Sequence, residues 1–488
     1  MARYFKYKSP ADLIDDAAER GVPIELADDL APLFEPLDVP VPGGAPRRLG
    51  NRLAVQPMEG CDGTPDGRPD ELTYRRYRRF GAGEAKLIWG EATAVADDGR
   101  MNPRQLWLAD HSASEIADML AGCREEHRAA CGDDGDLLVG LQLTHSGRYS
   151  FRGPLIPVRD PLLDPRTVDR ATGKPIGDDF AILSDDDLRR IQDQFVAAAK
   201  LAREVGCDFI DVKQCHKYLL CELLAASNRP GEYGGSYENR TRFVRELIGR
   251  IRAEIPDLLI ASRFNAYDGV PFHKGADGLG EPDEHAAPLT NSFGTDPHDH
   301  AKPATEEPRR LAADLAAWGV SLLNVSSGNP YACPHLVRPA ELPPTDGYLQ
   351  PEHPLVGIHR HFTLTAAVQE SAVTPDGVRV PVVGSGYSWL QDYAFAAAAA
   401  NVAAGRCDLV GYGRGSLSHP DFARTLKKSG KLNRKQVCRT FSYCTNIMRT
   451  KDHPLGQYPT GCPPFDREVY DPIYKEVKAK LSDAASRK

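Results

Sequence analysis

Residues 184–213 read SDDDLRRIQDQFVAAAKLAREVGCDFIDVK and contain the pattern from which the fold can be predicted. An amphipathic stretch with helical spacing, 185–205, leads through a turn into a short apolar run with β-branched residues, 209–213. Ser184 followed by Asp187 is a helix-capping pair, because a side-chain oxygen at Ser184 can accept the free amides of the first turn. This stretch therefore predicts a helix followed by a strand.

The same alternation recurs between Asn51 and His419. The predicted strands are 52–56, 86–90, 137–143, 209–213, 258–263, 322–325, 380–383 and 408–411. The predicted helices are 71–80, 114–130, 185–205, 239–253, 307–318, 355–371, 389–404 and 420–428. Parallel strands need crossover helices, and eight of them close around a packed interior. The order of elements therefore predicts a closed α/β barrel, with a doubly wound open sheet as the main alternative.

The predicted organisation is a single elaborated barrel. It consists of an N-terminal extension at 1–50 with a helix at 11–20, a (β/α)8 TIM barrel at 51–429, and a C-terminal tail at 430–488 packed on the barrel. Residues 266–306 are rich in Gly, Pro, Asp and His without a sustained period, which predicts a long loop after the fifth strand. Such a loop lies on the active-site face of a barrel, although a merely solvated insertion is an equal alternative.

Composition limits the class of protein. The chain has 488 residues, with 60 Lys and Arg against 68 Asp and Glu, so its net charge is −8 and a nucleic-acid partner is not expected. With 41% hydrophobic and 26% charged residues it is typical of a globular protein. No apolar stretch reaches the ~18 residues of a membrane span. Eleven scattered cysteines indicate reduced thiols and a cytoplasmic location.

Two long motifs carry a resemblance to a known family. Gln142-Leu-Thr-His145-Ser-Gly-Arg148 closes the third predicted strand, and Tyr233-Gly-Gly-Ser-Tyr-Glu-Asn-Arg240 precedes the fourth helix. In this order they resemble the Gln-Leu-x-His-x-Gly-Arg and Tyr-Gly-Gly-Ser-x-Glu-Asn-Arg runs of the Old Yellow Enzyme family of flavin-dependent oxidoreductases. The resemblance covers about 34–422 and implies the same barrel as the alternation of elements.

The resemblance implies a site for flavin mononucleotide (FMN) at the C-terminal ends of the strands. The matching positions include Gln142 for the pyrimidine edge and Arg263 for the flavin N1 and O2. Glycines after strands seven and eight admit close approach of a phosphate, and an arginine clamps it. The implied cofactor-binding residues are Gln56, Pro57, Met58, Gln142, Arg263, Gly384, Ser385, Gly386, Gly413 and Arg414.

The implied acceptor side departs from the family pattern. In the run Asp211-Val-Lys-Gln-Cys-His-Lys-Tyr218, Lys213 stands where many relatives have histidine, and Lys217 where they have glycine. In this alignment His216 matches the second of the two residues that donate a hydrogen bond to the substrate oxygen. Tyr218 matches the phenol that protonates the substrate carbon. At Lys213 a flexible charged side chain replaces a rigid imidazole, and this change favours substrates with an anionic or strongly polarised oxygen. We also assign His145, Tyr331 and His335 to the substrate pocket, with a hydrogen-bonded strand-end histidine as the alternative for His145.

The tail contains Cys438, Cys444 and Cys462. Their spacing is similar to the four-cysteine iron–sulfur run of some longer relatives, but one ligand is missing. An iron–sulfur cluster is normally held by four thiolates, so we expect reduced structural thiols and no metal.

The resemblance implies an NAD(P)H oxidoreductase with FMN, an ene-reductase that transfers hydride from NADH or NADPH to an alkene activated by a carbonyl. His216 and Lys213 would polarise the carbonyl, and Tyr218 would supply the proton. Three alternatives stay open: a flavin-dependent dehydrogenase or desaturase of an amine, alcohol or carbonyl compound, a Schiff-base lyase using Lys213, and a non-catalytic binding module. The expected partners are a small-molecule substrate and, undecided, a second copy of the chain.

Overall fold

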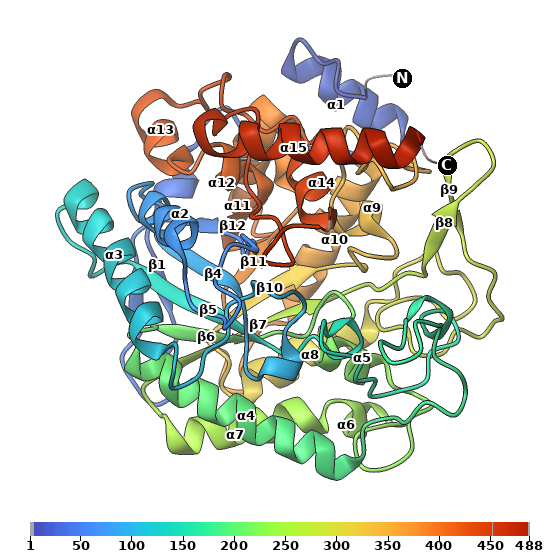
Figure 1. Ribbon diagram of the computed structural model, residues 1–488. Coiled ribbons are helices and arrows are strands. Elements are labelled where there is room, and N and C mark those ends of the chain that lie inside the picture. The colour runs from blue at the N-terminus through green and yellow to red at the C-terminus, as the bar shows by residue number, and fades with distance from the viewer. Residues whose placement is uncertain (1–3, 451, 487–488) are drawn as a thin grey trace.

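The computed structural model describes residues 4–450 and 452–486, and its centre is a closed barrel of parallel strands (Figure 1). The last strand pairs with the first, with Val410 beside Leu53, so the predicted barrel is confirmed and an open sheet is excluded. The barrel strands, in chain order, are β3 (Leu53–Val55), β4 (Leu87–Ala94), β5 (Leu138–Thr144), β6 (Phe209–Val212), β7 (Leu259–Asn265), β10 (Leu322–Ser326), β11 (Val382–Gly384) and β12 (Leu409–Tyr412).

Amphipathic helices surround the strands, and their apolar faces pack against the outside of the barrel. The main ones are α2 (Glu71–Gly81), α3 (Ala113–Cys131), α4 (Asp185–Glu204), α7 (Arg242–Glu254), α8 (Glu306–Ala317), α10 (Pro354–Ser371), α11 (Ala394–Ala403) and α13 (Phe422–Ser429). Four short helices follow strands or turns: α5 (Leu219–Ala225), α6 (Tyr237–Arg240), α9 (Pro334–Val337) and α12 (Arg414–Ser418). The predicted capping pair is present, because Ser184 Oγ accepts the Asp187 amide at 3.1 Å.

Two predicted helices differ from the structure. The helix predicted at 239–253 starts earlier and is divided at Thr241 into α6 and α7. The helix predicted at 389–404 begins as a 3-10 helix, η5 (Tyr387–Tyr393), and becomes α11 only at Ala394. Gln391 has a positive φ of 52°, which interrupts the regular hydrogen-bond ladder at that point.

The N-terminal extension closes one end of the barrel. After α1 (Pro10–Glu19), the hairpin of β1 (Leu37–Val39) and β2 (Arg47–Leu49) places Val39 and Leu49 in the apolar cluster inside the barrel, with Trp89 and Phe209. The long loop after β7 also contains a small antiparallel hairpin, β8 (Phe272–Lys274) with β9 (Gly280–Pro282), that its composition did not predict.

The tail returns to the barrel through two helices, α14 (Tyr443–Arg449) and α15 (Arg467–Ser486) (Figure 1). Asp466, before α15, is anchored by Arg75 at 2.7 Å and by Arg79, both on α2. Before α14, Thr440 Oγ1 accepts the Glu341 amide at 2.9 Å. These contacts fix α14 beside the loop that follows β10.

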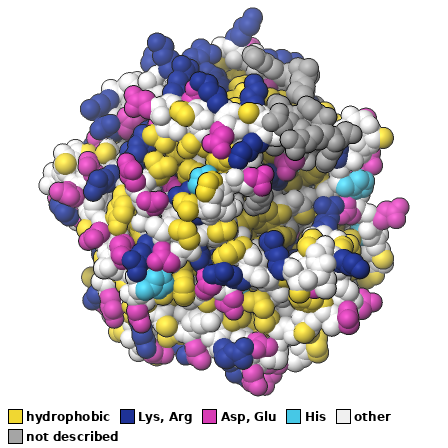
Figure 2. Space-filling view, viewed as in Figure 1, with side chains coloured by type: hydrophobic (Ala, Val, Ile, Leu, Met, Phe, Trp, Pro, Cys, Tyr) yellow, Lys and Arg dark blue, Asp and Glu magenta, His cyan; other side chains and the backbone are white. Residues whose placement is uncertain are grey.

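The surface charge is uneven along the chain. From Phe422 to Thr450 there are eight Lys and Arg residues and no Asp or Glu. Figure 2 shows basic side chains gathered at the upper left of the view, over α13 and the start of the tail. Within residues 4–450 and 452–486, no helix is both long and apolar enough to cross a membrane.

Candidate active site

A cavity of about 450 Å³ opens at the C-terminal ends of the barrel strands. It collects most of the residues that the sequence predicted for a flavin and its substrate. These are Gln56, Pro57, Met58, Gln142, Lys213, His216, Tyr218, Arg263, Tyr331, Ser385, Gly386, Gly413 and Arg414. They come from both halves of the barrel and meet because the carboxyl ends of all parallel strands lie on one face.

Gln56, at the end of β3, is held by its neighbours across the barrel. Its Nε2 donates to Ser385 Oγ at 2.9 Å, and its Oε1 accepts from Asn324 Nδ2 at 2.8 Å. A Cβ atom at Gly411 would lie 1.9 Å from Gln56 Nε2, so a glycine is required there. These contacts fix the floor of the cavity between β3, β10 and β12.

Asp211, buried on β6, orients two residues of the cavity wall. Its carboxylate accepts from Gln142 Nε2 at 2.6 Å and from the Arg263 amide at 2.7 Å. Burial raises the pKa of Asp211, and the hydrogen bonds oppose this shift. Asp211 therefore fixes which end of the Gln142 amide is the donor. The Arg263 Nε is buried and has no partner in the part of the chain that the structure describes.

The turn between β6 and α5 supplies Lys213, His216 and Tyr218. The Lys213 Nζ lies 3.7 Å from the centre of the Tyr218 ring, a cation–π distance. The Tyr218 hydroxyl is 2.9 Å from the Tyr331 hydroxyl, and His216 Nε2 is 2.8 Å from Ser326 Oγ. Lys213 and Tyr218 are therefore organised by their mutual contact and by the loop after β10, and His216 is held by the last residue of β10.

Burial controls the protonation of this group. It raises the pKa of Tyr218 well above its usual value, and nearby Glu59 adds to the effect, so the phenol keeps its proton. Burial also lowers the pKa of His216 well below 6.5, and Arg263 and Lys213 lower it further, so the imidazole is neutral. The pKa of Lys213 is lowered chiefly by burial. The site thus offers a protonated phenol next to a neutral imidazole.

Glu59 is a cavity residue that the sequence reasoning missed. It follows Met58 directly, and Asn102 Nδ2 donates to its Oε2 at 3.3 Å. Burial raises the pKa of Glu59, whereas the charge of Lys213 lowers it. Its position immediately after Gln56-Pro57-Met58 was the available signal. The cavity therefore contains an acid–base group besides Tyr218.

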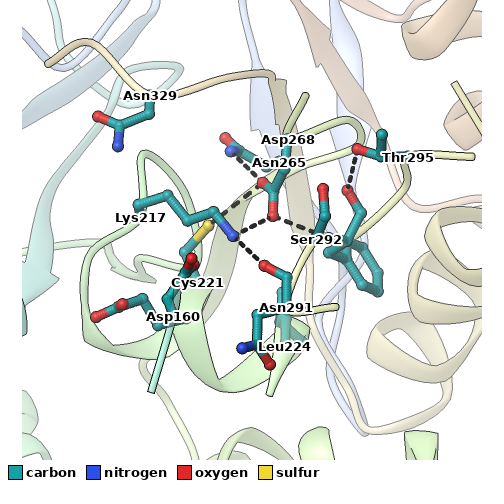
Figure 3. Close-up of polar contacts among 12 residues, drawn as sticks. Asp160, Lys217, Cys221, Leu224, Asn265, Asp268, Asn291, Ser292, Thr295 and Asn329 are labelled. Atoms are coloured by element: carbon teal, nitrogen blue, oxygen red, sulfur yellow. Dashed lines mark hydrogen bonds and ion pairs between the residues drawn. The ribbon is translucent and has the colours of Figure 1, made fainter. Parts of the chain in front are cut away.

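A buried ion pair holds the turn that carries these side chains (Figure 3). Lys217 Nζ lies 2.8 Å from Asp268 Oδ2 and donates to the Asn291 carbonyl at 2.7 Å. Asn265 Nδ2 donates to the other Asp268 oxygen at 2.7 Å, and Asn265 Oδ1 accepts the His216 amide at 3.2 Å. Lys217 has a positive φ of 58°, a backbone conformation that favours glycine. The ion pair thus fixes an unfavourable turn and ties it to the long loop after β7.

The other end of the cavity suits a phosphate. Gly386 has a φ of 101°, and a Cβ at Gly413 would meet nothing closer than 3.5 Å, so backbone is accessible there. Arg414 donates through Nη2 to the Pro339 carbonyl at 2.7 Å. Its Nη1 is buried without a partner among the described residues. A buried guanidinium nitrogen of this kind needs an acceptor, and an anion supplies one.

Comparison with known proteins identifies the family. Residues 32–291, just over half of the chain, match the model of the NADH:flavin oxidoreductase / NADH oxidase family, Oxidored_FMN. The chain belongs to this family. The predicted relationship to the Old Yellow Enzyme family is confirmed, because these are the flavin oxidoreductases that its motifs resemble.

Curated relatives match a little under half of the chain. The chain is 31% identical over 233 residues to an NADPH dehydrogenase from Geobacillus sp. strain WCH70, covering 46% of this chain and 61% of the relative. It is 30% identical over 254 residues to the NADH:flavin oxidoreductase FG08077 from Gibberella zeae, covering 49% of this chain and 54% of that protein. The chain thus spans between 54% and 61% of the length of these relatives.

Solved structures share the fold. The old yellow enzyme homologue from Zymomonas mobilis superposes with a TM-score of 0.58 at 21% identity, over 88% of this chain and 99% of its own. Morphinone reductase superposes with a TM-score of 0.54 at 20% identity, over 83% of this chain and 92% of its own. Histamine dehydrogenase from Rhizobium sp. 4-9 superposes with a TM-score of 0.56 at 20% identity, over 82% of this chain and 48% of its own. At these identities the likeness concerns the barrel.

The arginines of the two motifs that resemble the Old Yellow Enzyme family form ion pairs within the barrel framework. Arg148 pairs through Nε with Glu222 at 2.7 Å and through Nη1 with Asp164 at 2.6 Å. Arg240 pairs with Glu307 on α8. Only Gln142 of the two runs lines the cavity. The arginines of the two motifs therefore tie elements of the barrel together, while Gln142 belongs to the cavity wall.

Three predicted site residues do not line the cavity. His145 turns away, because its Nδ1 accepts the Gly147 amide at 3.2 Å and its Nε2 lies 3.6 Å from Asp98. His335 points under the long loop, where Nδ1 is 2.7 Å from the Tyr348 hydroxyl and the ring packs edge-on against Phe272. Gly384 is the last residue of β11, one residue before the cavity lining at Ser385. The structure therefore places His145, His335 and Gly384 outside the lining of this cavity.

Residues of the tail take part in the cavity wall, which the sequence did not suggest. They are Cys444, Thr445, Met448, Arg449 and Thr460. Cys438, Cys444 and Cys462 are free thiols. Within the described ranges, no group of three or more His, Cys, Asp or Glu side chains is placed to hold a metal ion.

Proposed function

We propose that the protein binds FMN in this cavity and acts as an NAD(P)H oxidoreductase on alkenes conjugated to a carbonyl group. The observation that carries the proposal is a pair of buried guanidinium nitrogens without partners among the described residues, Arg263 Nε and Arg414 Nη1, on one cavity. These atoms suit the anionic parts of a reduced flavin nucleotide, its ring and its phosphate.

The chain offers a partner for each part of the nucleotide. Pro57 and Met58 line the cavity next to Gln142, whose amide suits the pyrimidine edge, and Arg263 suits the N1 and O2 positions. Ser385, Gly386, Gly413 and Arg414 suit the phosphate. When bound, the flavin supplies hydride transfer between the nicotinamide and the acceptor.

The residues of the β6–α5 turn act on the acceptor. Lys213 and His216 donate hydrogen bonds to the carbonyl oxygen, on which negative charge builds during reduction. Tyr218 then donates its hydroxyl proton to the α carbon, and its contact with Tyr331 holds the hydroxyl in place. Lys213, 3.7 Å from the ring centre, stabilises the phenolate that is left.

The test begins with the visible spectrum of the purified protein, followed by anaerobic titration with NADH and with NADPH. We expect a bound flavin that one or both nicotinamides bleach and that an enone or enal reoxidises. Colourless protein that cannot bind FMN would contradict the proposal. An adduct on Lys213 after borohydride treatment of such protein with a carbonyl compound would support a Schiff-base lyase instead.

A second candidate function runs the chemistry in the oxidative direction, as a dehydrogenase of an amine or alcohol. Glu59 favours it, because a buried carboxyl group with a raised pKa beside Lys213 can take a proton from the substrate. Anaerobic bleaching of the flavin by an amine or alcohol, and not by either nicotinamide, would establish this direction.

A further inference from the structure

The cavity holds an arginine that the flavin site does not need. Arg338 follows α9, lines the cavity and is only partly exposed. Its guanidinium has no hydrogen-bond or ion-pair partner among residues 4–450 and 452–486. An arginine loses its hydration when it lines a cavity, and it normally recovers this loss through a carboxylate or phosphate.

A second arginine approaches the same place from the tail. Arg449, the last residue of α14, lines the cavity and lies 2.9 Å from Asp346, which is itself 59% exposed. Its Nη2 donates to the Pro330 carbonyl at 3.2 Å, next to Tyr331. Arg449 is thus fixed at the mouth of the cavity, while Asp346 faces solvent and neutralises it only in part.

The charges of the cavity wall do not balance. Five cations line it, Lys213, Arg263, Arg338, Arg414 and Arg449, against two carboxylates, Glu59 and Asp346. Burial lowers the pKa of Arg338, and Arg414 and Arg449 lower it further, because they crowd positive charge around it. Arg338 belongs to the loop that both neighbouring arginines contact, because Arg414 donates to the Pro339 carbonyl and Arg449 to the Pro330 carbonyl.

We propose that Arg338 and Arg449 form an anion-binding subsite beside the flavin phosphate position, which takes a carboxylate or phosphate group of a molecule bound over the flavin. The inference rests on the proposed function. The anion belongs either to the acceptor, as a carboxylate, or to the nicotinamide nucleotide, as its phosphates. Carboxylates and phosphates are both negatively charged, and a guanidinium group can bind two oxygens of either one. The subsite also gives the tail a role, since the barrel alone lacks Arg449.

The experiment measures ligand affinity in the flavin-loaded protein by calorimetry, at low and high salt. Cinnamate is compared with cinnamamide, which has the same shape without the charge, and adenosine diphosphate with adenosine. We expect the charged member of at least one pair to bind about tenfold more tightly at low salt, with the advantage reduced by added salt. The pair that shows it identifies the source of the anion.

Arg338→Gln and Arg449→Gln should each remove most of this advantage and leave the affinity of the neutral ligand within about twofold. Arg338→Lys should keep part of it, because the charge remains while the paired hydrogen bonds are lost. Arg245→Gln, at an exposed position of α7, is the matched control and should change nothing.

Two results would overturn the inference. One is equal binding of charged and neutral ligands by the unmodified protein. The other is loss of bound flavin from Arg338→Gln to the extent seen for Arg414→Gln, because Arg338 would then belong to the flavin phosphate site. Failure of the proposed function is a different result, because the unmodified protein would then take up no flavin. The visible spectrum of the unmodified protein tells the two cases apart.

Discussion

Lys213 and Tyr218 contact each other, and the contact links recognition to proton transfer. The ammonium lies 3.7 Å from the centre of the ring, and the hydroxyl is bonded to Tyr331. A positive charge over the ring stabilises the phenolate that forms when the proton leaves. The lysine that departs from the family pattern therefore assists Tyr218 as well as the acceptor oxygen.

Removal of the Tyr218 hydroxyl should affect only one half of the catalytic cycle. Tyr218→Phe should reduce the rate of acceptor reduction by about 10²- to 10³-fold, the usual contribution of a positioned general acid. Reduction of the flavin by nicotinamide should change by less than about twofold, because it needs no proton from this residue. Stopped-flow absorbance measures the two steps separately. Equal slowing of both steps, or of neither, would refute the assignment of the proton donor.

Removal of the Lys213 charge should weaken ligands that carry an oxygen anion. Lys213→Met keeps most of the aliphatic stem and should weaken their binding about tenfold or more, since hydrogen bonds to charged groups contribute about 1.5–3 kcal/mol. The measurement is a titration of the flavin absorbance with a phenolate or carbonyl ligand. Lys274→Met, exposed on β8, is the control. An unchanged titration curve would make Lys213 a structural residue.

The β6–α5 turn and the long loop after β7 stabilise each other. Lys217 and Asp268 are almost completely buried, with 8% and 0% of their side chains exposed. Burial lowers the pKa of Lys217, but the charge of Asp268 outweighs this effect and raises it, so the ammonium stays protonated. Asp268 also accepts the Phe293 amide at 2.9 Å, which brings the far part of the loop to the turn. The loop is therefore part of the site's framework.

Lys217→Met should be strongly destabilising, because it leaves the Asp268 carboxylate buried without a cation. We expect the free energy of unfolding to fall by about 3–5 kcal/mol, measured by chemical denaturation. Lys200→Met is the matched control: Lys200 is half exposed and pairs with Glu254 at 2.6 Å, so its loss should cost less than about 1 kcal/mol. Similar costs for the two variants would show that the buried pair does not anchor the turn.

The N-terminal hairpin and the C-terminal tail complete the barrel at opposite ends. The hairpin adds Val39 and Leu49 to the barrel interior, while the tail adds Met448 and Arg449 to the cavity. One addition is apolar and the other brings charge. The extensions are therefore integral to the fold and to the site respectively.

Buried histidines should make the protein sensitive to acid. Burial lowers the pKa of His335 to about 3 and that of His361 to about 4, whereas an unfolded chain has histidines near 6.5. Between pH 6.5 and these values the unfolded chain binds protons that the folded chain does not. Their stabilising contribution is thus complete above pH 6.5, and the free energy of unfolding falls with pH below it, by about 1.4 kcal/mol per pH unit for each group.

Chemical denaturation at pH 7.5, 6.0 and 5.0 measures this slope. His335→Gln should remove the contribution of one proton, about 1.4 kcal/mol per pH unit, from the slope of the free energy of unfolding against pH. This change in slope is expected whatever the substitution does to the stability at pH 7.5. His298→Gln, at an exposed position of the long loop, should leave the slope unchanged. A His335→Gln slope equal to that of the unmodified protein would contradict the role of burial at this residue.

Local patterns in the chain were sufficient to predict the barrel, because each strand and helix has its own hydrophobic period and eight such units can close around one interior. They also placed Gln142 and Arg263 at strand ends, whereas the roles of these residues and of Tyr218 were implied by the family resemblance. Gln391 was beyond this reasoning, because its positive φ has no signature in the surrounding helical period.

What required the folded chain were contacts between segments far apart in sequence. His145 has the neighbours of a site residue in its motif, but the Gly147 amide and Asp98 turn it away. Arg449 lies more than 100 residues after Pro330, and its place in the wall depends on the path of the tail. Hydrophobic periods report which face of an element is buried, and they carry no information on which charged side chains meet across a cavity, because that depends on how whole segments pack.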